Sequence, residues 1–177
     1  KVNYLSTMSE LTIKPFTGFE VKANFTYNYT SSNSWNRSAN CTYSDTPGEV
    51  ATLTTGYFLD RLTESVTFQN YIQTNVFATY NTSIADAHNI KVMAGYTYER
   101  KHIKDLTLSG ENLLSDTLND LDLIGTNADG EKVTDASGGQ NEYAIQSAFA
   151  RINYDYKERY LIELNGRFDG TSRFAAG

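Results

Sequence analysis

Cysteine, proline and long apolar runs are scarce in this sequence. Among its 177 residues there are one cysteine, Cys41, and two prolines. A lone cysteine cannot form an internal disulfide, which disfavours a small secreted module held together by such bridges. No stretch approaches the roughly 20 apolar residues of a transmembrane helix. A membrane β-barrel is not excluded, because its strands alternate apolar and polar side chains.

Positive charge is also in short supply. The net charge is −6, which argues against a nucleic-acid partner, since such partners require a basic face. What the sequence has in quantity is aromatic residues: 13 tyrosines and 9 phenylalanines, against one tryptophan. Tyrosine and phenylalanine are common in β-strands.

Apolar and polar residues alternate over long stretches. The clearest run is 19–30, in which the odd positions are Phe, Val, Ala, Phe, Tyr and Tyr and the even ones are polar. Period two is the signature of a strand with one apolar and one polar face. The same pattern predicts strands over 66–80, 90–99, 148–156 and 160–169, and a weaker one over 2–13. About six antiparallel strands are therefore expected.

Parity restricts how these strands pair. Directly opposed residues of an antiparallel hairpin share a face, so two strands with even apolar positions need an odd number of loop residues. This predicts that Tyr156 faces Tyr160 across residues 157–159, with Tyr154 opposite Ile162. The same reasoning predicts Tyr80 opposite Ile90 across 81–89, and Ile13 opposite Phe19 across 14–18. All three hairpins then share one apolar surface.

The connections alternate between short and long. Short turns are predicted near 14–18, 81–89 and 157–159, and long polar loops near 31–64 and 100–141. This alternation is typical of outer-membrane barrels, which have short periplasmic turns and long extracellular loops. The fold class predicted is thus an all-β antiparallel meander that forms part of a large transmembrane β-barrel.

Aromatic residues gather near the predicted strand ends, as in the two aromatic girdles that flank the apolar band of such barrels. From Tyr160 to Phe168 is a distance of roughly 26 Å along a strand, or about 20 Å along the membrane normal at a tilt of ~40°. A simple preference of tyrosine for strands is the plainer explanation, and we favour the girdle. The predicted lipid-facing girdle residues are Tyr27, Tyr29, Tyr80, Tyr96, Tyr98, Tyr154, Tyr156, Tyr160 and Phe168.

Two C-terminal motifs resemble those of the SusC/RagA family of TonB-dependent outer-membrane transporters. The first is the stretch 151–160, Arg-Ile-Asn-Tyr-Asp-Tyr-Lys-Glu-Arg-Tyr, and the second is 167–174, Arg-Phe-Asp-Gly-Thr-Ser-Arg-Phe. Thr171, where the family has serine, is the one departure. The resemblance is strong over 143–174 and looser before it. The sequence begins in a strand-like stretch and ends without a natural stop, so we expect residues 1–177 to be an internal barrel segment.

This resemblance implies a function for the parent protein. Family members import oligosaccharides or peptides together with a SusD-like surface lipoprotein, possess a plug, and draw energy from TonB. It implies a parent barrel of about 22 strands, an outer-membrane location in a Gram-negative bacterium of the Bacteroidetes, contact with outer-membrane lipid, and a dimeric SusC–SusD assembly. The plug and the TonB box are expected outside the chain.

The polar face of the last hairpin carries the candidate site residues. Those on the shared motifs that are predicted to face the lumen are Arg151, Asn153, Glu163, Arg167, Asp169 and Arg173. They could contact cargo or plug; alternatively, they form an ion-pair network that holds strand register, which we favour. The segment 169–174 could also cradle a phosphate, but without a following helix or lysine a turn is the better interpretation.

The long loops offer two further candidates. Trp35 and Tyr43 are hypothetical cargo contacts, because sugars stack on aromatic faces; packing against neighbouring loops is the alternative. The acidic loop 116–135 could bind Ca²⁺, but it lacks the ligand spacing of a calcium loop and is better explained as solvated. No other metal site, cofactor or catalytic set is predicted, and the protein is not expected to be an enzyme. A passive porin or barrel adhesin, and a soluble carbohydrate-binding β-sandwich, are the competing functions.

Overall fold

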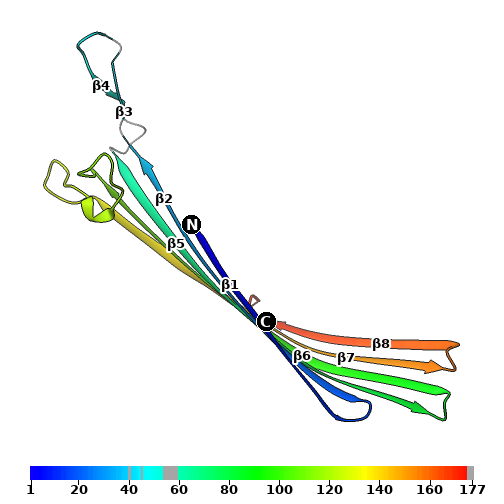
Figure 1. The fold of residues 1–177 in the computed structure, drawn as a ribbon. Helices are drawn as coiled ribbons and strands as arrows, with labels where there is room; N and C mark the ends of the chain where they lie inside the picture. The colour runs from blue at the N-terminus through cyan, green and yellow to red at the C-terminus, as the bar shows by residue number, and fades with distance from the viewer. Residues whose placement is uncertain (40, 45, 54–59, 175–177) are drawn as a thin grey trace. The chain divides into compact units, whose positions relative to one another are not determined.

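The computed structural model describes residues 1–39, 41–44, 46–53 and 60–174. Six long strands form one antiparallel sheet in sequential order, which is a meander. The strands are β1 (Val2–Phe16), β2 (Phe19–Ser38), β5 (Arg61–Ile84), β6 (His88–Glu111), β7 (Thr134–Tyr156) and β8 (Tyr160–Thr171) (Figure 1). A separate two-stranded sheet joins β3 (Cys41–Tyr43) to β4 (Ala51–Leu53). The predicted all-β meander is confirmed.

The chain divides into two compact units. The first contains the long-loop ends of the strands, residues 1–3, 30–68 and 104–140, and the second contains the turn ends, residues 4–29, 69–103 and 141–177. The one helical element of the described residues is a 3₁₀ turn, η1 (Leu121–Leu123), in the first unit. No helix in the described part of the chain is long and apolar enough to cross a membrane.

Short turns join the strands in the second unit. In β7–β8, Tyr156 pairs with Tyr160, Tyr154 with Ile162, Ile152 with Leu164 and Ala148 with Phe168, so the predicted register is confirmed. Lys157 and Glu158 have positive φ in this turn, and so do Ala85 and Asp86 in the turn between β5 and β6. Backbone hydrogen bonds also link these turns to neighbouring elements. The Lys157 N–H donates to the Ala87 carbonyl of the next turn at 2.8 Å, and the Asn81 N–H of β5 donates to the Gly18 carbonyl at 2.7 Å.

The two other predicted registers are wrong in detail. β5 ends at Ile84 and β6 begins at His88, so their turn is 85–87 rather than 81–89, and Tyr80 does not oppose Ile90. β1 and β2 are separated by Thr17 and Gly18 alone, so Ile13 does not oppose Phe19. At 85–87 the turn is odd in length, as parity requires, but parity does not distinguish registers that differ by two residues. The turn of β1–β2 has two residues, an even number, so here the parity rule for the loop length itself failed.

The strands also run well past their predicted ends. β2 and β5–β7 contain 20 to 24 residues, whereas roughly 9–11 residues cross a bilayer. The predicted loops 31–64 and 100–141 are therefore too long, since the connections are 39–60 and 112–133. Where a strand of a membrane barrel extends beyond the lipid, water contacts both of its faces. The alternation of apolar and polar residues that reveals a strand in the sequence is then lost, although the backbone pairing continues.

Several apolar side chains of the sheet are exposed. On β6, the apolar side chains of Val92 and Tyr96 are 37% and 45% exposed, while their neighbours Met93 and Thr97 on the polar face are less exposed. Most large apolar residues of β1 and β8, the two edge strands, are exposed as well. Among the described residues no second layer covers the apolar face, so the alternative of a soluble β-sandwich is wrong. An exposed apolar face and two unpaired edge strands are typical of a segment of a larger sheet.

Candidate functional site: the polar face and the loop anchor

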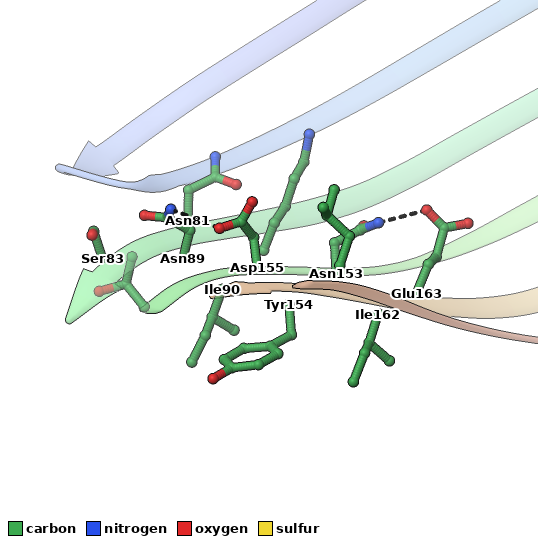
Figure 2. A pocket seen from close by; sticks show the side chains of 12 residues that line it. Asn81, Ser83, Asn89, Ile90, Asn153, Tyr154, Asp155, Ile162 and Glu163 are labelled. Atoms are coloured by element: carbon green, nitrogen blue, oxygen red, sulfur yellow. Dashed lines mark hydrogen bonds between the residues drawn. The ribbon is translucent and has the colours of Figure 1, made fainter. Parts of the chain in front are cut away.

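The polar face of the second unit contains odd-numbered residues of β5–β8. Figure 2 shows Asn153, Asp155 and Glu163 on one side of the strands, and Tyr154 and Ile162 on the other. A hollow of about 530 Å³ at this place takes its lining from both faces. It is therefore not a single-sided binding pocket, and the faces have to be considered separately.

Residues of the last hairpin form a continuous polar ladder. Glu163 accepts hydrogen bonds from the Asn153 amide at 2.5 Å and from the Asn165 amide at 2.6 Å, and Arg151 Nε donates to Asn165 Oδ1 at 2.7 Å. The distance from Arg151 Nε to Glu163 Oε1 is 4.0 Å. Both carboxylate oxygens of Glu163 are thus engaged within the sheet, and the ladder spans two adjacent strands.

Arg167 continues the ladder toward the strand end. Its Nε donates to Asp169 at 2.7 Å, and its Nη2 donates to the buried hydroxyl of Ser147 on β7 at 3.1 Å. The guanidinium of Arg173 lies 3.9 Å from the ring centroid of Tyr143, whose hydroxyl donates to Glu99 Oε1 at 3.3 Å. The six predicted lumen residues therefore share one hairpin, and each has a partner. Sequence patterns gave no reason to single out Ser147, Tyr143 or Glu99.

The opposite face carries the predicted girdle. At the turn end, Tyr156 stacks on Tyr160 with centroids 6.4 Å apart, and the Tyr154 hydroxyl lies 2.7 Å from Nδ1 of His88. The His88 ring is 5.0 Å from that of Tyr156. His88 has the even parity of Ile90, so the sequence signal existed but the predicted strand began two residues too late.

The other predicted girdle residues lie on the same apolar face of the sheet. The Tyr27 hydroxyl donates to Asn70 at 3.0 Å, and that of Tyr96 donates to Gln146 at 2.9 Å. Tyr80 and Phe168 are exposed, and Tyr29 and Tyr98 are half-buried. All of these residues lie on the long strands, on the parity that the sequence predicts.

A buried arginine anchors the first unit. Arg37, near the end of β2, donates from Nε and Nη2 to the two carboxylate oxygens of Asp60, each at 2.7 Å. The same guanidinium donates to the carbonyls of Ser115 and Leu118 at 2.8 and 3.1 Å and to Asn119 Oδ1 at 3.1 Å. The side chains of Arg37 and Asp60 are only 8% and 12% exposed. Hydrogen bonding to Asp60 raises the pKa of Arg37, against the opposing effect of burial.

The loop 112–133 is consequently ordered over the ends of the strands. The Asn112 N–H donates to the Asp60 carbonyl, and Leu113 bridges to Ile124, both of which are buried. Asp60 itself has a φ of 57°, a conformation that asparagine and aspartate adopt more readily than most residues. The acidic residues Asp116, Asp120, Asp122, Asp129 and Glu131 are exposed, as expected of a solvated acidic loop. Arg37 lay inside a predicted loop, where no pattern marked it.

The remaining predicted sites lie in the same unit. Trp35 is exposed but belongs to β2 rather than to a loop, and Tyr43 is exposed at the end of β3. The two other aromatic residues of this region, Tyr57 and Phe58, lie outside the described residues. Within the described ranges no three His, Cys, Asp or Glu side chains come together to hold a metal. In the acidic loop, Asn127 Oδ1 accepts hydrogen bonds from the backbone N–H groups of Asp129 and Glu131.

Comparison with known proteins finds similar receptors and similar solved structures. No family model matches the chain. TonB-dependent receptor P39 of Formosa agariphila is 34% identical over 111 residues, which are 61% of this chain and 10% of that receptor. TonB-dependent receptor P3 of the same bacterium is 28% identical over 115 residues, or 65% of this chain and 10% of the receptor.

Solved structures show the same fold. The RagAB peptide transporter matches 99% of this chain and 18% of its own, with a TM-score of 0.80 and 22% identity. The RagAB peptide importer in its 'closed-closed' state matches with a TM-score of 0.77. The predicted resemblance to SusC/RagA-type TonB-dependent transporters is confirmed. This SusC/RagA-like segment spans about a tenth of the length of the curated relatives, and its sheet is a fragment of a larger barrel.

Proposed function

We propose that residues 1–177 form part of the barrel wall of a TonB-dependent importer in the outer membrane of a Gram-negative bacterium of the Bacteroidetes. The observation that carries this proposal is the apolar face of the sheet, on which side chains such as Val92 and Tyr96 are exposed and no layer of the described residues covers them. Similarity to named TonB-dependent receptors supports energy-dependent import rather than passive diffusion. The cargo is an oligosaccharide or a peptide.

The parent protein is proposed to have a plug and about 22 strands, the size of plugged outer-membrane transporters. TonB would act on that plug, and a SusD-like lipoprotein would cover the extracellular side, in an assembly that can be dimeric. The ordered loop 112–133 and the β3–β4 hairpin are the elements that would face such a lipoprotein. The peptide transporter RagAB, to which the chain is similar, supports the search for a partner of this kind.

The two faces have separate proposed roles. The even-numbered aromatic residues of β5–β8, with Tyr27 and Tyr29, would contact lipid at the two membrane interfaces. The ladder from Arg151 to Arg173 would hold strand register, because its charged groups are already paired with one another. Trp35 and Tyr43 remain proposed cargo contacts at the extracellular side.

Uptake by cells that express the full-length transporter tests this function. Import of radiolabelled oligosaccharides and peptides should require the transporter and should stop when TonB is deleted or the proton-motive force is collapsed. A passive porin or a barrel adhesin is the alternative. Uptake that persists without TonB would establish a porin, and absence of any transporter-dependent uptake, with cell adhesion retained, would establish an adhesin.

A further inference from the structure

Three lysines surround a hollow on the polar face, at the turn end of the sheet. Lys14 of β1, Lys22 of β2 and Lys91 of β6 line this lysine hollow, which has a volume of about 690 Å³. Among the described residues of the lining, Glu20 is the one that carries a negative charge. Its carboxylate oxygens lie 3.0 Å from Lys14 Nζ and 3.3 Å from Lys22 Nζ. Two of the lysines therefore share a single carboxylate.

The lysine hollow keeps an excess of positive charge. Three ammonium groups and one carboxylate leave two positive charges without a counter-charge in the lining. Lys91 is exposed, and the structure gives its ammonium group no hydrogen bond or ion pair with another described residue. Inside a barrel the effective dielectric constant is lower than in bulk water, so an uncompensated charge is less well screened there. The excess charge favours an anionic occupant.

Apolar side chains adjoin these lysines. Phe77 of β5 and Met93 of β6 line the same hollow, have the odd parity of the polar face and are half-buried. A dissolved inorganic anion would leave both side chains in contact with water. A polypeptide segment with two or more carboxylates would neutralise the lysines, and its apolar atoms would cover Phe77 and Met93. Charge and apolar surface together fit an acidic peptide segment better than a simple ion.

We propose that the lysine hollow holds an acidic segment of the parent protein's plug. The proposal rests on the import function above, which includes a plug. The chain spans about a tenth of the length of the similar TonB-dependent receptors, so most of the parent polypeptide lies outside residues 1–177 and can supply this segment. One carboxylate of the segment pairs with Lys91, and another shares Lys14 and Lys22 with Glu20. The contact lies beside the short turns, which are the periplasmic end of bacterial barrels.

Zero-length coupling with a carbodiimide tests this contact in the purified full-length transporter. The reagent joins a lysine amine to a carboxylate as an amide, with loss of water, where the two groups touch. Mass spectrometry then identifies both residues. We expect Lys91 to be joined to an aspartate or glutamate of the plug. Coupling of Lys14 or Lys22 to Glu20 is the internal standard, because these groups are already in ion-pair contact.

Hydrogen exchange of the plug segment identified in this way measures the strength of the contact. Lys91→Gln removes the charge and should accelerate exchange of that segment about threefold to fivefold. Lys91→Arg keeps the charge and should restore the wild-type rate. The matched control is Lys101→Gln, because Lys101 lies farther along the same strand with the same parity. This control should leave the exchange of the segment unchanged.

Heat-dependent gel mobility checks barrel assembly, and if Lys91→Gln does not assemble, Lys14→Gln decides. Coupling of Lys91 to barrel residues or to a separate protein alone would overturn the docking site. Absence of any Lys91 coupling beside efficient coupling to Glu20 would overturn it too, as would unchanged exchange of the plug in Lys91→Gln. TonB-dependent uptake is measured separately, so a transporter that requires TonB but shows no contact between plug and lysines would keep the proposed function and refute this site.

Discussion

Replacement of Arg37 by methionine should release the loop 112–133 from the strand ends. The guanidinium makes five hydrogen bonds, two of them to Asp60 and three to residues 115–119. Removal of one member of a buried ion pair typically costs 3–5 kcal/mol, because the other charge is left unpaired. Both side chains retain slight exposure at the rim, so we take the lower end, about 3 kcal/mol. At 1.4 kcal/mol per tenfold change, the opening equilibrium should rise about a hundredfold.

Hydrogen exchange followed by mass spectrometry on the full-length transporter measures this opening. Peptides that cover 112–125 should exchange about a hundredfold faster in Arg37→Met, whereas the turn 157–159 should not change. The matched control is Arg100→Met, because the Arg100–Glu142 pair is 48% and 45% exposed. A pair this exposed contributes roughly 0–1 kcal/mol, so little acceleration is expected.

A double variant separates the ion pair from the packing. Arg37→Met combined with Asp60→Leu removes both charges, and much of the lost protection should return, since an apolar pair of similar volume can replace a buried ion pair. If Arg37→Met left exchange over 112–125 unchanged, the anchor would be refuted. Acceleration of equal size throughout the barrel would show that Arg37 supports global stability and not this loop.

Three further results are expected. A Cβ atom added to Gly95 would lie 2.5 Å from Cζ of Phe149. Gly95→Ala should lower barrel stability by about 1–3 kcal/mol through overpacking against Phe149, measured by heat-dependent gel mobility. Adding Phe149→Leu should restore part of this stability. No loss of stability in Gly95→Ala would contradict the close packing. Glu163→Gln should lower barrel stability by about 1 kcal/mol in the same assay, because one of the two hydrogen bonds that Glu163 accepts is kept. Uptake should not slow. A transport defect in a fully assembled barrel would instead indicate that Glu163 contacts cargo. Arg100 lowers the pKa of Glu142 through a hydrogen bond, so their contact should persist above the ordinary carboxyl pKa and disappear as the pH falls through the lowered one. Exchange of the 140–145 amides measured down through the acid range should show this loss, and Arg100→Met should abolish the pH dependence.

Much of the membrane-facing sheet could be predicted from the sequence, and the physical reason is the contrast between lipid and lumen. Alternation located the strands around Val92 and Tyr96, and parity gave the register of Tyr154 with Ile162. The same contrast disappears beyond the lipid, so the extensions of β2 to Ser38 and of β5 to Arg61 had no signal. Parity also could not separate registers that differ by two residues, which misplaced the turn at 85–87.

The candidate sites divide along the same boundary. The ladder around Arg151 and Glu163 could be anticipated, because the β7–β8 register brings its members together on one face. Arg37 and Asp60 lie 23 residues apart in a polar stretch, and no periodicity connects them. The role of Gly95 likewise depends on how Phe149 leans across from the neighbouring strand, which no spacing along a single strand reveals.

The backbone hydrogen bonds of the turns have a practical consequence for anyone who wishes to label this protein. An epitope or fluorophore inserted at Gly18, Ala87 or Lys157 would break the backbone hydrogen bonds that link Gly18 to Asn81 and Ala87 to Lys157. The β3–β4 hairpin offers a better position, since a side chain added at Gly48 would meet no atom within 4 Å. Gly48 has a φ of 95°, so insertion of a flexible tag beside it is preferable to its replacement. A reporter at this hairpin would leave the backbone hydrogen bonds at Gly18, Ala87 and Lys157 intact.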